Sequence, residues 1–301
     1  MKTVSFFSYK GGAGRTTLTI NVIPYLIERL NPTPEKPLIL VDMDIDSCGL
    51  TYIFDIDKNP EKYPEFKSGD GTVQKYFGSR GGVPQDDVEN ILEHRAFTRL
   101  CKVGNYFGVQ DECVLCLPAY PGSALGFGNS YDGNDKNIKE FKELCEVYGC
   151  VGLVLDSAVG DQLTARWSNA LSNKIVCCLR PTKQFRDGTE RFFFTFDKNN
   201  RNKTVIVVPN VVPTDKFRIL NPDGTSHEYP DYARSEINKI FDRFSNNRYV
   251  RDVVNGDIFG VPKIDRFMWQ ESVLKLNYEK DNPFERQALQ QYELIAKLIC
   301  E

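Results

Sequence analysis

Residues 4–17 constrain the fold more than any other part of this chain. An apolar run at residues 4–7 leads into a glycine-rich turn, and a helical pattern follows it at once. The turn and its end read, in order, Lys10, Gly11, Gly12, Ala13, Gly14, Arg15, Thr16 and Thr17. Glycines let the backbone curl so that successive N–H groups point at a phosphate, and a helix N-terminus adds partial positive charge. This layout predicts a phosphate-binding loop, in which the hydroxyl of Thr16 is placed to ligate Mg²⁺.

The loop resembles the deviant phosphate-binding motif KGGxGK[ST]T of the ParA/MinD family of ATPases. Every position matches except Arg15, which stands where the family has a lysine. The resemblance implies a SIMIBI-class P-loop NTPase that takes ATP and Mg²⁺, with the residues from Gly11 to Thr17 around the phosphates. It also implies an ATP-dependent homodimer in which Lys10 reaches the partner's phosphates. Because arginine binds oxygens as a planar fork rather than as a point charge, we expect ATP binding with slow hydrolysis.

Two later apolar runs, residues 37–41 and residues 151–155, end in carboxylates. Continuous apolar runs are typical of strands that are buried on both faces of a parallel sheet. In such sheets, ligands bind at the carboxyl ends of the strands. We therefore expect Asp42, Asp44 and Asp156 to lie beside the phosphate-binding loop.

The resemblance assigns roles to these carboxylates. Asp42 and Asp44 match the aspartates of the family's D-x-D-P-Q segment, and Asp156 matches the acid of its D-T-P-P segment, although the residues that follow diverge. The implied metal ligands are Thr16, Asp42 and Asp156. The implied catalytic residues are Lys10, Arg15 and Asp44, and of these Asp44 positions or polarises the attacking water. Asp46 has no counterpart in the family pattern.

Further strand and helix patterns complete an α/β chain. Apolar runs at residues 174–179 and 204–210 predict two more strands, and residues 283–299 predict a terminal helix. The alternation predicts a doubly wound, mainly parallel sheet flanked by helices. We expect one ParA/MinD-like ATPase domain over residues 1–301, with an elaborated segment at about 55–149.

The base of the nucleotide has two candidate contacts. In the family, an asparagine at a strand end contacts adenine, and a proline loop after the last strand closes over the base. The resemblance places these roles on Asn210 and on Pro262, within residues 259–265. Asparagine is also a common turn residue, so a turn at Asn210 stays open as the alternative.

Charge and composition limit the partners. A net charge of −3 argues against a protein that coats nucleic acid through its overall charge. Basic residues do cluster loosely between residues 234 and 266, interleaved with acids. A solvated helix face and a weak nonspecific DNA surface both remain open for this cluster.

Nine cysteines, several of them inside apolar runs, indicate buried thiols in a reducing compartment. Cys113 and Cys116 have C-x-x-C spacing, but with no second pair and only two histidines the chain lacks the pattern of a metal site built from cysteine and histidine. The sequence starts without a signal-peptide pattern, and no apolar run approaches the roughly 20 residues of a membrane span. We expect a cytoplasmic protein. The terminal helix is not strongly basic, so we expect no direct membrane anchor.

Three functions remain open from the sequence. The first is a slowly hydrolysing ATPase whose dimerisation switch positions or partitions a cargo, either DNA or a protein assembly. The second is a scaffold or adaptor that binds ATP with little or no hydrolysis. The third, a metal-cluster carrier ATPase, needs paired cysteines that bridge a dimer, and the spacing of Cys113 and Cys116 supports it poorly. The partner protein or cargo cannot be read from the sequence.

Overall fold

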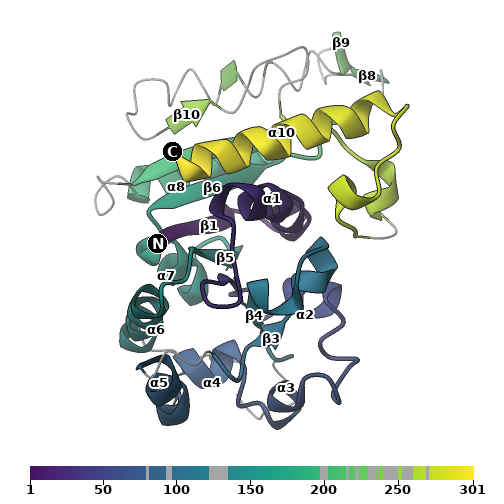
Figure 1. The fold of residues 1–301 in the computed structure, drawn as a ribbon. Helices are drawn as coiled ribbons and strands as arrows, with labels where there is room; N and C mark the ends of the chain where they lie inside the picture. Colours follow the sequence, from purple (N-terminus) through teal and green to yellow (C-terminus); the bar gives the residue numbers. More distant parts are fainter. Residues whose placement is uncertain are drawn as a thin grey trace.

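The chain alternates between strands and helices, and the strands gather into one central sheet (Figure 1). The computed structural model describes residues 1–78, 81–92, 97–121, 135–196, 203–214, 217–220, 224–229, 235, 238–239, 250–252, 260–268 and 271–301. The sheet has eight strands in the order β10-β7-β6-β1-β5-β2-β4-β3. They are β1 (Lys2–Ser8), β2 (Leu38–Asp42), β3 (Cys101–Lys102), β4 (Val114–Leu117), β5 (Gly152–Val159), β6 (Lys174–Leu179), β7 (Thr204–Pro209) and β10 (Val250–Asp252). Every neighbouring pair is parallel except β3 with β4, so the expected doubly wound, mainly parallel α/β fold is confirmed.

Helices cover both faces of the sheet. The first helix, α1 (Arg15–Leu30), packs against the last, α10 (Pro283–Cys300), on one face, while α7 (Leu163–Leu171) and α6 (Asp135–Tyr148) lie on the other (Figure 1). The remaining α-helices described by the structure are α2 (Gly49–Ile53), α3 (Pro64–Ser68), α4 (Val73–Phe77), α5 (Gln85–Leu92) and α8 (Lys183–Phe196). Short 3₁₀ turns lie at Gly104–Phe107, Asp111–Cys113, Asp265–Met268 and Leu274–Leu276.

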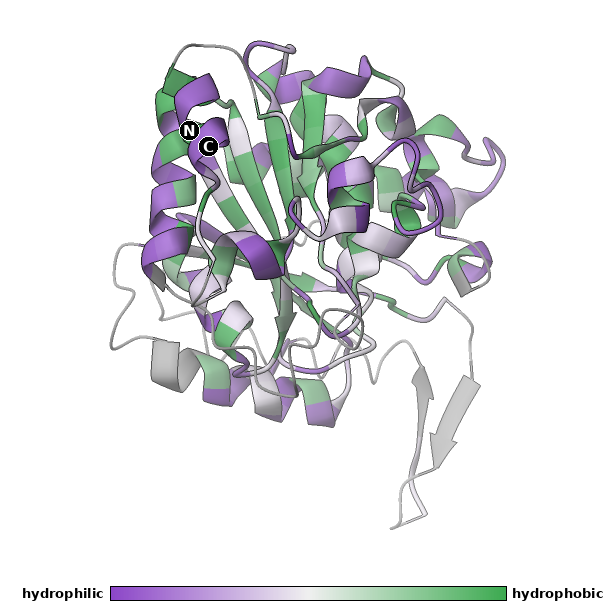
Figure 2. Cartoon of the chain, turned by 90° about the horizontal axis from the view of Figure 1, so that it is seen from below, coloured by the Kyte–Doolittle hydropathy of each residue, from purple (hydrophilic) through white to green (hydrophobic). Residues whose placement is uncertain are grey.

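The strand residues are buried on both faces, which explains their continuous apolar runs. In β2, Leu38 and Leu40 belong to the core shared with α1, whereas Ile39 and Val41 belong to the core under α6. Successive side chains of a strand point to opposite faces, so a run without polar residues fills two cores at once. Figure 2 shows these apolar strands running between helices that carry hydrophilic residues.

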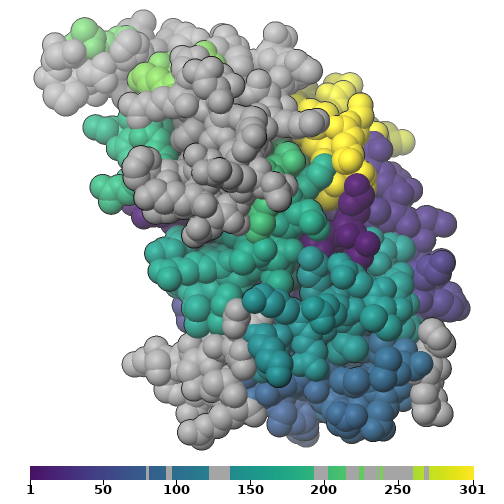
Figure 3. Space-filling view, turned by 90° about the vertical axis from the view of Figure 1, so that its left-hand side faces the viewer, coloured from purple at the N-terminus to yellow at the C-terminus, as the bar shows by residue number. Residues whose placement is uncertain are grey.

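The terminal helix begins where capping chemistry predicts. The side chain of Asn282 accepts hydrogen bonds from the backbone N–H groups of Phe284 and Glu285, and Pro283 occupies the first turn. The helix ends beside the start of β1, and Figure 3 shows the first residues next to the end of α10. Among the described residues, none of the helices combines the length and the apolar character that crossing a membrane requires.

Some elements differ from the sequence-based expectations. The last strand expected within residues 259–265 is wrong: residues 260–264 form a loop with a single bridge between Val212 and Pro262. Pro262 has no N–H to donate, and Gly260 has a φ of +101°, so neither suits a strand. The parallel strand at that edge is instead β10. A hairpin of β8 (Phe217–Leu220) and β9 (Ser226–Tyr229) was not expected from the sequence. A helix pattern between residues 232 and 244 lies almost entirely outside the described residues.

Candidate functional site

The glycine-rich loop connects β1 to α1 at the carboxyl edge of the sheet. Gly12 and Gly14 have φ values of +79° and +73°, in the left-handed region that favours glycine. Gly14 also precedes α1 directly, and its carbonyl accepts the helix hydrogen bond of Leu18. A Cβ on Gly14 would lie 2.9 Å from the amide nitrogen of Asn210, so this position requires glycine for two reasons.

A cavity of about 450 Å³ lies over this loop. It is lined by the loop from Gly11 to Thr17 and by Ser8, Asp44, Asp46, Ser47, Val159, Gln162 and Glu271. We call it the phosphate cavity, because the glycine loop and the N-terminus of α1 open into it. The loop residues expected to surround phosphate are thus in one place, together with Asp44. Asp46 also lines this cavity, where it accepts a hydrogen bond from Gln162.

Arg15 fills the inner wall of the phosphate cavity and pairs with two carboxylates. Its Nη2 lies 2.5 Å from Asp44 Oδ2, and its Nε lies 3.2 Å from Asp156 Oδ1. A third contact, of 3.4 Å, joins Nη1 to the hydroxyl of Ser8. The side chain is only 6% exposed. Burial alone lowers the pKa of Arg15, but the charges of Asp156 and Asp44 outweigh burial and raise it, so the guanidinium stays charged.

Asp156 is fully buried and accepts hydrogen bonds at both oxygens. Its Oδ1 accepts from Arg15 and Thr19, and its Oδ2 accepts from the hydroxyl of Thr16 at 2.8 Å. Burial raises the pKa of this carboxyl, while Arg15 and Thr16 oppose the rise. Thr16 and Asp156, two of the three residues expected to bind metal, are therefore in direct contact. Thr19 was missed in the sequence, although its spacing of four residues from Arg15 places it on the same helix face.

The donor set suits Mg²⁺ in its chemistry. A hydroxyl and carboxylates are the hard oxygen ligands that Mg²⁺ prefers. However, Arg15 already neutralises Asp44 and Asp156, and the part of the chain that the structure describes has no group of three or more His, Cys, Asp or Glu residues arranged to hold a metal. Thr16 and Asp156 therefore fit the ion only once Arg15 moves away.

Asp42 lies beside Asp156 in the register of β2 and β5, but its carboxylate does not line the phosphate cavity. Its Oδ2 accepts hydrogen bonds from the backbone N–H and the hydroxyl of Thr51, while its buried Oδ1 has no partner. Burial and then the charge of Asp156 raise the pKa of Asp42 to about 7. A role for Asp42 as a metal ligand stays a prediction, because its carboxylate is turned toward Thr51.

Lys10 lies at the front of the loop, and its carbonyl accepts a hydrogen bond from Ser8. The residue is partly exposed and does not line the phosphate cavity of its own chain. The preceding residue, Tyr9, packs on helix α8, where a Cβ on Gly188 would lie 2.2 Å from the tyrosine ring. Lys10 is thus held at the rim, outside its own site.

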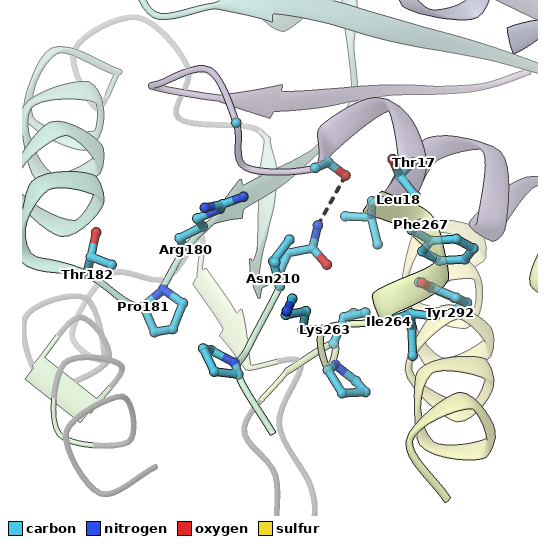
Figure 4. Close-up of a pocket in the computed structure, with 16 residues that line it drawn as sticks. Thr17, Leu18, Arg180, Pro181, Thr182, Asn210, Lys263, Ile264, Phe267 and Tyr292 are labelled. Atoms are coloured by element: carbon cyan, nitrogen blue, oxygen red, sulfur yellow. Dashed lines mark hydrogen bonds between the residues drawn. The ribbon is translucent and has the colours of Figure 1, made fainter. Parts of the chain in front are cut away.

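A second cavity, of about 480 Å³, lies on the other side of the loop (Figure 4). Asn210 and Pro262 both line it, so the two residues expected at the base are brought together. The amide nitrogen of Asn210 donates to the carbonyls of Ala13 and Gly14, at 2.8 and 3.1 Å. The apolar wall includes Ile264, Phe267 and Tyr292, which lie together on one side in Figure 4. We call this cavity the base cavity.

The two cavities share three lining residues, Gly12, Gly14 and Thr17. Several other lining residues were missed by the sequence analysis. Arg180 follows β6 and points toward the loop in Figure 4, and Glu271 and Gln162 line the phosphate cavity. Glu271 lies 254 residues away from its hydrogen-bond partner Thr17, so no local pattern could have indicated it.

Comparisons with known proteins identify the fold. No protein-family model matches the sequence, and no curated protein matches it. Solved structures do match over nearly the whole chain. MinD cell division protein from Aquifex aeolicus has a TM-score of 0.59 at 16% identity, covering 100% of this chain and 98% of that one. A ParA, from pNOB8 and bound to nonspecific DNA, has a TM-score of 0.56 at 14% identity, with 99% and 96% covered.

A third match is an enzyme of another kind. Cobyrinic acid a,c-diamide synthase from Mycobacterium smegmatis, with a bound ATP analogue and magnesium, has a TM-score of 0.56 at 13% identity, with 99% and 93% covered. Matches at such low identity show the fold and not the activity. The chain has the fold of the MinD- and ParA-type P-loop ATPases, as the glycine-rich loop indicated.

Proposed function

We propose that this chain binds ATP across the glycine-rich loop, with the phosphates in the phosphate cavity and the adenine in the base cavity. One observation carries the proposal: the two cavities meet at Gly12, Gly14 and Thr17, so one elongated ligand reaches both. The loop offers backbone N–H groups to anionic oxygens. With its nitrogen held by the loop, Asn210 has its oxygen left to accept from an amino group such as that of adenine.

Arg15 is the residue that responds to the nucleotide. In the structure it pairs with Asp44 and Asp156, and the phosphate cavity it borders would hold further anionic oxygens. Its Nε and Nη2 already donate to the two carboxylates, so the oxygens of a γ-phosphate would compete with Asp44 and Asp156 for the same guanidinium. Triphosphate binding therefore draws Arg15 away from Asp44, which then becomes free to orient water. Because each turnover needs this exchange of partners, hydrolysis is slow.

Magnesium, when bound, would supply positive charge against the phosphate oxygens, held by Thr16 and Asp156. Asp44 lies at the same end of the cavity and would orient the attacking water. Neutralising the charge that develops on the phosphate is the main catalytic requirement of such a site.

Dimerisation by ATP is the second half of the proposal. Lys10 stands at the rim and does not line its own phosphate cavity, which suits a residue that reaches a second copy of the chain. ATP between two protomers would join them, and loss of the γ-phosphate would release them. Such a switch positions or partitions a cargo, a role we propose here by analogy with the fold.

Calorimetry and size measurements test the proposal together. Titration with ATP, ADP and GTP should show binding of ATP in the micromolar range or tighter, with ATP preferred over GTP. Light scattering after size exclusion should show a dimer with ATP and a monomer with ADP. Lys10→Ala should bind ATP as the wild type does and stay monomeric, whereas the surface control Lys36→Ala should still dimerise. If the wild type bound no ATP in calorimetry and formed no dimer with ATP in light scattering, the proposal would be overturned.

A scaffold with little hydrolysis is the alternative, and Asp44→Ala separates the two. In an ATPase this variant loses turnover and remains dimeric, whereas in a scaffold it causes no functional change. The metal-cluster carrier is tested by metal analysis of the purified protein. Cys113 and Cys116 are buried in the protomer, which does not suit ligands shared across a dimer.

DNA as the cargo is tested by binding at several salt concentrations, with and without ATP. Arg234, Arg243 and Arg248 of the loose basic cluster lie outside the described residues, whereas Lys239, Arg251, Lys263 and Arg266 lie inside them. Lys263 pairs with Asp265, and Arg266 pairs with Glu285. A DNA surface would show an affinity that falls steeply as salt rises.

A further inference from the structure

Glu271 stands where the two cavities meet. Its Oε1 accepts a hydrogen bond of 3.2 Å from the hydroxyl of Thr17, and Thr17 lines both cavities. Glu271 itself lines the phosphate cavity. A carboxylate is therefore fixed at the junction that a ligand must cross to fill both cavities.

Such a carboxylate is unexpected beside a phosphate site. Its negative charge repels a polyphosphate, and within the described residues no lysine or arginine lies within 4 Å to neutralise it. A carboxylate accepts hydrogen bonds and donates none when ionised. The feature that would offset its repulsion is a ligand group that carries O–H donors at this point.

The position of Glu271 is set by the first helix. Asn21 is buried one turn after Thr17, and its side-chain nitrogen donates to the carbonyls of Thr17 and Ser272. Its side-chain oxygen accepts from the backbone N–H of Leu274 at 2.7 Å. These bonds tie the chain directly after Glu271 to the helix that carries Thr17. The carboxylate is held beside the loop by buried contacts, although its own side chain is exposed.

We propose that Glu271 accepts hydrogen bonds from the ribose hydroxyls of the bound nucleotide and selects ribonucleotides over deoxyribonucleotides. With the base in one cavity and the phosphates in the other, the sugar lies at the junction beside Thr17. The vicinal 2′- and 3′-hydroxyls are the O–H donors of a nucleotide at that point. In dinucleotide-binding folds an acidic side chain accepts a hydrogen bond from a ribose hydroxyl in a similar way. The inference rests on the proposed nucleotide site and specifies which sugar that site takes.

Binding of sugar analogues tests the inference. The affinities of ATP, 2′-deoxyATP and 3′-deoxyATP are measured by calorimetry for the wild type, Glu271→Gln and Glu271→Ala. The wild type should bind ATP about tenfold more tightly than at least one deoxy analogue, as expected for a lost hydrogen bond to a charged group. Glu271→Ala should bind ATP and the analogues alike, and Glu271→Gln should lie between. The control Glu293→Gln, at an exposed carboxylate of α10, should discriminate as the wild type does.

Two failures are distinguishable. If ATP binds but the wild type takes the deoxy analogues equally well, or if Glu271→Ala keeps the discrimination, the role of Glu271 is overturned while the nucleotide site stands. If no nucleotide binds to the wild type, the proposed function fails and this inference fails with it. Circular dichroism melting of each variant confirms that the differences come from folded protein.

Discussion

The buried ion pairs of Arg15 make a strong and testable prediction about stability. Replacing Arg15 with methionine keeps most of the side-chain volume and removes the charge. Asp44 and Asp156 are then left without their cation, at side-chain exposures of 7% and 0%. Breaking a buried pair by removing one partner costs about 3–5 kcal/mol, because the remaining charge stays buried. We expect Arg15→Met to lose that much free energy of unfolding at pH 7.5.

The assay is urea unfolding of the nucleotide-free protein, followed by circular dichroism. Arg166→Met is the matched control, since Arg166 also pairs with an aspartate, Asp161 at 2.6 Å, but on the surface. Surface pairs contribute about 0–1 kcal/mol. The double variant Arg15→Met/Asp44→Asn should recover part of the loss, because one unpaired carboxylate is gone. A loss for Arg15→Met no larger than that for Arg166→Met would refute the reasoning.

The loss should also depend on pH. Without Arg15, burial and the charge of Asp44 raise the folded-state pKa of Asp156 further above that of an unfolded aspartate. A raised carboxyl pKa means that the folded state binds more protons, so its stability falls as pH rises. The difference between Arg15→Met and the wild type should therefore shrink as the pH is lowered from 7.5 to 5.

Three other substitutions follow from single contacts. Asp42→Asn should flatten the pH dependence of the unfolding free energy measured with urea. The pKa of Asp42 is about 7 in the folded state and ~4 in the unfolded state, so the wild type becomes less stable as the pH rises between these values. The substitution should remove this loss, which amounts to at most about 4 kcal/mol. Gly188→Ala should lower the unfolding free energy by about 1–2 kcal/mol and lower the melting temperature with it. The new Cβ would lie 2.2 Å from the Tyr9 ring, and this clash outweighs the better helix propensity of alanine. Asn210→Ala should weaken ATP binding about tenfold in calorimetry, since the carbonyls of Ala13 and Gly14 lose their donor.

The sequence predicts the parts of the site that local patterns determine. The strand from Lys174 to Leu179 has the predicted bounds, and the strand predicted over residues 204–210 ends one residue earlier, at Pro209. A strand buried on both faces and a glycine turn each have a signature within a few residues. The short strands β3 and β10 have two and three residues, too few to show any period, and only their sheet neighbours define them.

Tertiary contacts decide what the sequence left open. Asp44 and Asp156 were expected beside the loop but not as partners of Arg15, and Glu271 was not expected at the site at all. Glu271 follows a segment without a strand signal, so its approach to Thr17 depends on the buried contacts of Asn21. Residue type and spacing along the sequence do not predict a long-range contact such as that between Thr17 and Glu271.

The contacts of Arg15 change the meaning of the one mismatch in the loop. A lysine at this position would present a single point charge, whereas arginine bridges Asp44 and Asp156 with different nitrogens. The bridge sets the one positive charge of Arg15 against two carboxylates, and Asp46 and Glu271 add two more carboxylates to the wall of the phosphate cavity. A triphosphate adds negative charge, so its binding requires Arg15 to change partners or a cation to enter with it. Under the proposed function, hydrolysis would depend on this rearrangement of Arg15, and this links the stability of Arg15→Met to the slow turnover that we propose.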